Sequence, residues 1–185
     1  GEGLVLQPAG ERGRFGFELE SRRPKALPVM FSALRFSALA GRRMHLVVCG
    51  SVAAYKAVEL MRMAQKSGLG VGVTVTPAAA RFVTPLTFAS LGADVVYEGM
   101  FGQEDGSVYG HLNPGAAAHA FVVAPATADF LFRAAHGAAD TLAAAQALAF
   151  PGSMVVAPAM NPRMWANAAT QENVALLRRR GHLVL

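Results

Sequence analysis

Cysteine is nearly absent from this chain, which has 185 residues and one Cys, Cys49. A single Cys cannot form a disulfide within the chain or supply a Cys-rich zinc site, and it is typical of a reducing compartment such as the cytoplasm. The five His residues do not have the spacing of metal ligands either. We therefore expect a cytoplasmic protein with no bound metal.

Charged side chains are also scarce and unevenly distributed. They make up 16% of the residues and give a formal net charge of +5, whereas a typical globular domain contains about 25%. Residues 1–43 hold eight basic and four acidic side chains, and residues 44–185 hold nine and eight. The body of the chain is therefore close to neutral, which removes most of the case for nucleic-acid binding. A weakly charged surface instead suits a domain that buries area in an oligomer.

No apolar run is long enough to cross a membrane. The candidate at 26–40 is interrupted by Pro28 and Arg35, and a spanning helix needs about 20 apolar residues. Residues 1–43 have no sustained helical or strand period, and their four Glu argue against an organellar transit peptide. We expect residues 1–43 to be a poorly ordered extension, or sequence upstream of a natural start at Met44. Residues 44–185 are expected to form the folded domain.

Three familiar motifs are missing. The first apolar run is not followed by G-x-G-x-x-G, and neither a Walker A loop nor G-x-S-x-G occurs. These absences argue against a standard dinucleotide loop, a P-loop and a hydrolase nucleophile elbow.

From Met44 onward, short apolar runs alternate with helical patterns. Strands are predicted at 44–49, 70–76, 93–97, 119–124, 153–157 and 182–185, and helices at 52–67, 84–91, 127–136, 140–150 and 170–180. Strands that are apolar along their whole length and alternate with helices are typical of a parallel sheet covered on both faces. The sequence therefore predicts a three-layer, doubly wound α/β domain, Rossmann-like or flavodoxin-like, with about six strands.

In such sheets a ligand binds beyond the carboxyl ends of the strands, near the switch in strand order. Free N–H groups at helix starts favour a phosphate or another anion there, and Ser51, Thr76 and Thr127 could add hydroxyl donors. Each of these hydroxyls could equally serve only as a helix N-cap. A phosphorylated, partly aromatic ligand such as FMN would fit. The segments at the predicted strand ends are 49–51, 76–77, 99–115, 125–127 and 158–161.

These segments resemble those of the phosphopantothenoylcysteine decarboxylases, which are flavin-containing cysteine decarboxylases. The resemblance covers the chain from Met44 to its end. The matching segments are GSVAAYK at 50–56, TPAA at 76–79, FVTPL at 82–86, YGHL at 109–112, APATAD at 124–129, PAMNPRMW at 158–165 and ATQEN at 169–173.

The resemblance implies an FMN enzyme that converts 4′-phosphopantothenoylcysteine to 4′-phosphopantetheine in coenzyme A synthesis. In relatives the flavin oxidises the cysteine thiol to a thioaldehyde-like species, CO₂ leaves to give an enethiolate, and the reduced flavin returns its electrons. Relatives are homo-oligomers, trimers or multiples of trimers, that hold each flavin between subunits. The implied partners are therefore a small-molecule substrate and further copies of the chain.

The resemblance also assigns roles to individual residues. His111 is the implied catalytic base or proton shuttle, a role suited to a pKa near neutrality. Asn161 is the implied hydrogen-bond donor to the substrate carboxylate, with Met160 beside it, and Asn161 could also cap the helix that follows. Met164 and Trp165 are expected to pack beneath this segment. The implied flavin-binding residues are Gly50, Ser51, Thr76, Thr127, Ala128 and Asp129.

Two departures from the family pattern leave other functions open. Leu185 lies inside the predicted sixth strand, so we expect a domain truncated before the flap whose Cys donates a proton in the reductive half-reaction, and without the ligase domain of bifunctional relatives. Cys49 follows the first strand and is interpreted as a buried core residue. One alternative is oxidative decarboxylation of a peptide's C-terminal cysteine, which does not need the flap Cys. Another is a non-catalytic binding protein, like fungal relatives that inhibit a phosphatase.

Overall fold

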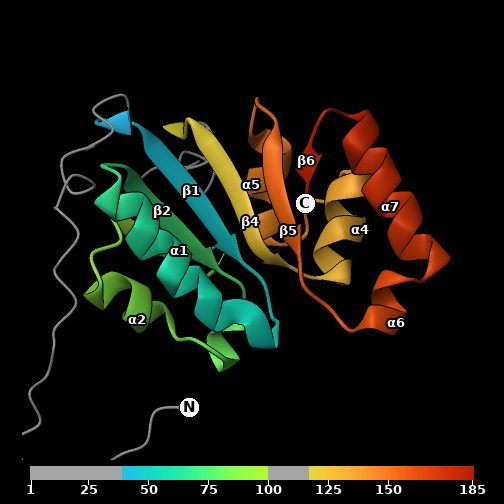
Figure 1. Cartoon of the computed structure of the whole chain (residues 1–185), viewed down its shortest axis with the longest axis horizontal. Coiled ribbons are helices and arrows are strands. Elements are labelled where there is room, and N and C mark those ends of the chain that lie inside the picture. The colour runs from blue at the N-terminus through green and yellow to red at the C-terminus, as the bar shows by residue number, and fades with distance from the viewer. Residues whose placement is uncertain (1–38, 100–116) are drawn as a thin grey trace, which may run out of the picture. The chain divides into compact units, whose positions relative to one another are not determined.

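A sheet of six parallel strands forms the centre of the computed structural model, which describes residues 39–99 and 117–185 (Figure 1). The strand order is β3-β2-β1-β4-β5-β6, so the order reverses between β1 and β4. This arrangement confirms the predicted doubly wound α/β fold. The strands are β1 (Arg43–Val48), β2 (Gly70–Val75), β3 (Val95–Tyr97), β4 (Ala120–Ala126), β5 (Met154–Pro158) and β6 (Leu183–Val184).

Helices cover both faces of this sheet. Helices α1 and α2 pack on one face, and α4, α5 and α7 pack on the other (Figure 1). None of the helices within the two described ranges is long and apolar enough to cross a membrane. The helices are α1 (Tyr55–Lys66), α2 (Pro85–Ser90), α4 (Ala128–His136), α5 (Leu142–Ala149), α6 (Pro162–Trp165) and α7 (Ala168–Arg179), with 3₁₀ turns η2 (Val52–Ala54) and η3 (Ala79–Arg81).

Burial on both faces explains why the strands are apolar along their whole length. In β1, Leu46 and Val48 belong to the core beneath α1 and α2, whereas Val47 belongs to the core beneath α4, α5 and α7. Alternate side chains of a strand point to opposite faces, so a strand covered on both sides needs apolar residues at every position. The aromatic anchors Phe88 and Phe121, one in each core, are fully buried.

Local capping sets where the helices begin. The Oγ1 atoms of Thr127 and Thr141 each accept a hydrogen bond from a first-turn N–H, at 3.3 Å, at the starts of α4 and α5. The Oδ1 of Asn167 accepts from the N–H of Ala169 at 3.0 Å at the start of α7. Gly137 ends α4 with φ at +68°, a left-handed conformation that favours glycine.

The structure differs from the predicted boundaries at the carboxyl end of β4. This strand extends through Pro125 to Ala126, two residues beyond the predicted 119–124, and the peptide bond before Pro125 is cis. The carbonyl of Pro125 accepts a hydrogen bond from the N–H of Cys49 at 3.1 Å. The carbonyl of Ala126 accepts one from the N–H of Ala159 at 2.9 Å. These bonds need no N–H on the proline, so sheet pairing continues past it and the loop begins at Thr127.

Candidate functional site

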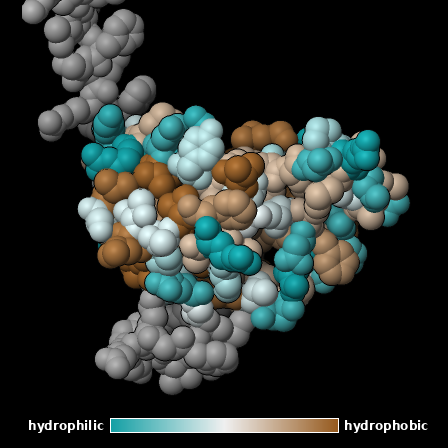
Figure 2. Space-filling view, turned by 90° about the horizontal axis from the view of Figure 1, so that it is seen from below, coloured by the Kyte–Doolittle hydropathy of each residue, from teal (hydrophilic) through white to brown (hydrophobic). Residues whose placement is uncertain are grey.

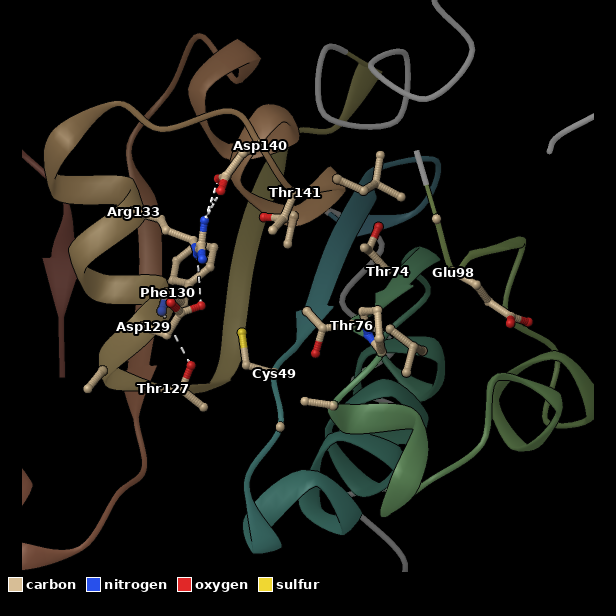
Figure 3. A pocket seen from close by; sticks show the side chains of 18 of the residues that line it. Cys49, Thr74, Thr76, Glu98, Thr127, Asp129, Phe130, Arg133, Asp140 and Thr141 are labelled. Atoms are coloured by element: carbon tan, nitrogen blue, oxygen red, sulfur yellow. Dashed lines mark hydrogen bonds and ion pairs between the residues drawn. The ribbon is translucent and has the colours of Figure 1, made fainter. Parts of the chain in front are cut away.

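A cavity of about 720 Å³ opens at the carboxyl ends of β1, β2, β3 and β4 (Figure 3). Its wall is formed by the residues that follow these strands, by the first turns of α4 and α5, and by Met164 of α6. Small-molecule sites typically enclose roughly 300–1,000 Å³. The cavity therefore has the size of a ligand site and lies at the switch in strand order, where the sequence predicted one.

Two of the predicted hydroxyl residues, Thr76 and Thr127, line this cavity. The Oγ1 of Thr76 accepts from the N–H of Ala79, and that of Thr127 accepts from the N–H of Phe130, both at 3.3 Å. A hydroxyl that accepts a hydrogen bond keeps its own hydrogen for donation. Capping and ligand binding, which the sequence left as alternatives, are therefore compatible at both residues.

The first turn of α4 adds backbone donors beside Thr127. Ala128 and Asp129 are the first two residues of this helix and line the cavity. The N–H groups of Phe130 and Leu131 bond to the side chain and carbonyl of Thr127, whereas those of Ala128 and Asp129 form no hydrogen bond among the described residues. Two unpaired amides at the positive end of a helix dipole suit an anionic group.

Gly50 lines the cavity at the point where the loops that follow β1 and β2 touch. A Cβ added to Gly50 would lie 3.0 Å from the carbonyl carbon of Ala78 and closer still to its Cβ. Glycine is therefore needed for packing between the loops. Ser51, also predicted for the flavin site, lies next to Gly50 but not in the wall, and its Oγ accepts from the N–H of Ala53 at 3.3 Å.

The predicted substrate residues Met160 and Asn161 follow β5 and are not part of the described wall. Asn161 is exposed, and its Oδ1 accepts from the N–H of Arg163 at 2.8 Å, so it caps α6. Met160 is half-buried against the core beneath α7. His111, the predicted base, lies outside the described residues.

Met164 and Trp165 were both expected to pack beneath the segment that follows β5. Trp165 does pack against the core. The prediction for Met164 is wrong, because its side chain is 49% exposed and lines the cavity. In the short helix α6, adjacent residues point in different directions, so one faces the core and the other faces the cavity.

Sequence reasoning missed an ion-pair cluster in the wall. Arg133 on α4 bonds to the Oδ2 of Asp129 at 2.9 Å and to both carboxylate oxygens of Asp140 (Figure 3). The spacing of Asp129 and Arg133 by four residues was a readable signal for a helical pair. The contact between Arg133 and Asp140 has no such sequence signal, because it depends on the turn at Gly137 that brings Asp140 back toward α4. The Arg133 guanidinium holds the pKa of Asp140 below its usual value.

Cys49 lies in the cavity wall but is 2% exposed, which confirms the prediction of a buried Cys. Burial raises the pKa of its thiol to about 12. The thiol is therefore protonated at physiological pH. Because the thiolate is the reactive form of cysteine, Cys49 lines the cavity as a neutral, unreactive side chain. Within residues 39–99 and 117–185, no cluster of three or more His, Cys, Asp or Glu side chains could hold a metal ion.

The strand order and the cavity at its switch point place the chain among the doubly wound α/β proteins, and the amide and hydroxyl donors around the cavity suit an anionic ligand. Sequence comparison gives the family. The chain belongs to the Flavoprotein family, whose model matches residues 36–185. This membership indicates that the cofactor is a flavin.

Individual relatives agree with this assignment. The chain is 40% identical over 143 residues to a probable phosphopantothenoylcysteine decarboxylase of Streptococcus mutans, covering 76% of this chain and 80% of that protein. It is 37% identical to the coenzyme A biosynthesis bifunctional protein CoaBC of Haemophilus influenzae, covering 77% of this chain but only 36% of that protein. Among solved structures, the FMN-dependent cysteine decarboxylase SpaF matches with a TM-score of 0.74 and 32% identity, over 80% of this chain and 85% of SpaF.

Replacing Gly50 with Ala should destabilise the protein by about 1–3 kcal/mol, because the new Cβ overpacks the contact with Ala78. Urea unfolding measures this change. The second substitution Ala78→Gly should restore part of the loss, because it removes the nearest atom. A G50A variant as stable as the wild type would show that the two loops do not approach so closely.

Replacing Arg133 with Met should raise the pKa of Asp140 toward its usual value, since the cation that favours the ionised carboxylate is lost. In the wild type this carboxylate contributes stability above its unfolded-state pKa, and the contribution disappears as the pH falls through the lowered folded-state pKa. Carbon NMR titration of the carboxyl groups measures the shift. Lys56→Met removes an exposed pair with Glu59 on α1 and is the matched control. An unchanged Asp140 titration in R133M would contradict the ion pair.

Proposed function

We propose that this chain binds FMN and decarboxylates 4′-phosphopantothenoylcysteine to 4′-phosphopantetheine, a step of coenzyme A synthesis. The observation that carries the proposal is the 40% identity to the Streptococcus mutans relative, of which the chain covers 80%. The identity to the cysteine decarboxylase SpaF is lower, at 32%. The two curated relatives, at 40% and 37% identity, are both coenzyme A proteins and therefore favour the coenzyme A reaction over decarboxylation of a peptide's cysteine.

The residues of the cavity fit a flavin. The hydroxyl hydrogens of Thr76 and Thr127 and the amides of Ala128 and Asp129 offer donors for a phosphate and for the polar edge of a ring system. Most of the remaining wall is apolar, which suits the flat ring of a flavin. Gly50 and Ser51 are proposed to complete the site by shaping the loop after β1.

Catalytic and substrate-binding roles are proposed for three residues, His111, Asn161 and Met160. Bound FMN would supply the two-electron redox chemistry, accepting electrons from the substrate cysteine and returning them after CO₂ has left. His111 is proposed to accept and return the proton of the reacting cysteine. The Oδ1 of Asn161 already accepts from the N–H of Arg163, which leaves its amide NH₂ group to bind the substrate carboxylate. Met160 is proposed to contact the substrate beside it.

The protein is proposed to be a cytoplasmic homo-oligomer, a trimer or a multiple of trimers, that does not bind nucleic acid. Figure 2 views the carboxyl ends of the strands, and apolar surface gathers on the half of this end where α1 and α2 lie. Large apolar residues exposed at the starts of η2, α1 and α2 and directly after η3 are Val52, Tyr55, Leu86 and Phe82. Exposed apolar patches mark interaction sites, and a second copy of the chain is the proposed partner.

Titration of FMN with the purified chain tests the cofactor directly, because a bound flavin changes its fluorescence and visible absorbance. Thr127→Val removes one donor and should weaken FMN binding about 10- to 100-fold, the value of a hydrogen bond to a charged group. Thr127→Ser keeps both the cap and the donor and should bind like the wild type.

Thr87→Val, on α2 away from the cavity wall, serves as the control for a lost hydroxyl. A wild-type chain that leaves free FMN unchanged would contradict the flavin proposal. Unaltered affinity in T127V, with a wild type that binds, would remove only Thr127 from the site.

Asn161→Asp separates the two roles of this residue. Aspartate is as good an N-cap as asparagine, so α6 and the unfolding midpoint should be retained. Its negative charge should repel the substrate carboxylate and reduce kcat/KM by about 100-fold or more. Coupled measurement of CO₂ release and thermal unfolding checks both expectations. Full activity in N161D would show that Asn161 is a structural cap alone.

A further inference from the structure

Three buried polar side chains form a hydrogen-bonded chain behind the cavity wall. His45 of β1, Thr74 of β2 and Gln146 of α5 are each at most 1% exposed. The Nε2 of His45 lies 2.8 Å from the Oγ1 of Thr74, and that oxygen donates to the Oε1 of Gln146 at 2.7 Å. These hydrogen bonds link strands β1 and β2 of the sheet to helix α5.

The direction of each hydrogen bond follows from the number of protons. Thr74 has one hydroxyl hydrogen, and it is donated to Gln146. Its oxygen can then only accept from His45, so the Nε2 of His45 carries a proton. Burial lowers the pKa of His45 to about 4, so the ring is neutral at physiological pH and holds this single tautomer.

Helix α5 buries mostly small side chains. Its sequence, LAAAQALA, contains one polar residue, Gln146, among small and aliphatic side chains. A helix face of alanines interlocks weakly with a sheet, because a methyl group forms only shallow ridges. A directional buried hydrogen bond specifies one position among several similar apolar packings. The hydrogen bond from Thr74 to Gln146 can therefore fix the position of α5 on the sheet, whereas the alanine side chains form no hydrogen bonds.

The same contact bears on the cavity. Thr74 lines the wall, and so do Thr141 and Leu142 at the start of α5, one helical turn before Gln146. In Figure 3 the hydroxyl oxygen of Thr74 points away from Cys49 and Thr76. Its hydrogen is already committed, so Thr74 offers the ligand no O–H donor.

We propose that His45, Thr74 and Gln146 form a positioning relay that holds the first turn of α5 in place and so sets the affinity of the cavity for its ligand. His45 and Gln146 act through Thr74 and α5, since neither lines the cavity. The identity of the ligand rests on the proposed function, whereas the relay itself does not. The relay is a feature of the protein without ligand.

Two measurements on Thr74→Val test the relay. This isosteric change removes the hydroxyl, and in the ligand-free protein it should speed amide hydrogen exchange in α5 by about tenfold or more, with no equal change in α1. It should also weaken FMN binding by about tenfold. Thr74→Ser keeps the hydroxyl and should restore both values to within about twofold of the wild type.

Val71→Ala is the matched control, because Val71 lies on the same strand but in the core beneath α1 and α2. It should lower the unfolding midpoint while leaving FMN affinity within about twofold. If T74V does not fold, Gln146→Met tests the same link and leaves the contact between His45 and Thr74 in place. Exchange in α5 should again accelerate.

The outcomes separate the relay from the proposed function. A wild type that does not bind FMN overturns the proposed cofactor, and the exchange measurement alone then decides on the relay. Unchanged α5 exchange in T74V, or in Q146M where T74V does not fold, overturns the relay. An equal loss of FMN affinity in V71A also overturns it, because general destabilisation would then explain the effect.

Discussion

The parallel pairing of β1 with β2 on one side and β4 on the other is the constraint on which the rest of the structure depends. It brings three strand ends to one edge of the sheet, while the chain leaves them toward helices on opposite faces. Hydrogen bonds continue past the regular strands, from Thr76 to Val48 at 3.0 Å and from Cys49 to Pro125 at 3.1 Å. The cavity between these ends is therefore a direct consequence of strand order.

At this edge of the sheet, the same side chains stabilise the fold and line the ligand cavity. Thr76 and Thr127 accept hydrogen bonds that start the next turn or helix and keep their hydrogens for the cavity. Arg133 ties α4 to Asp140 and at the same time forms part of the wall. A site built in this way needs few dedicated residues, which agrees with the low charge of the chain. It also means that loss of one side chain affects both folding and binding.

The sequence predicted the sheet, its helices and most of the cavity edge, because apolar runs, Pro and Gly are local signals. It could not give the reason for Gly50, since the contact with Ala78 exists only after β1 and β2 pair. It could not connect Arg133 to Asp140 across the turn at Gly137. No sequence pattern singled out His45, because only its pairing opposite Gly72 in β2 brings it within reach of Thr74.

Release of labelled CO₂ from carboxyl-labelled 4′-phosphopantothenoylcysteine, with FMN present, tests the central claim most directly. The account predicts steady release from this substrate and much slower release from a peptide that ends in cysteine. A chain that holds FMN yet releases CO₂ only from the peptide, or from neither compound, would contradict it.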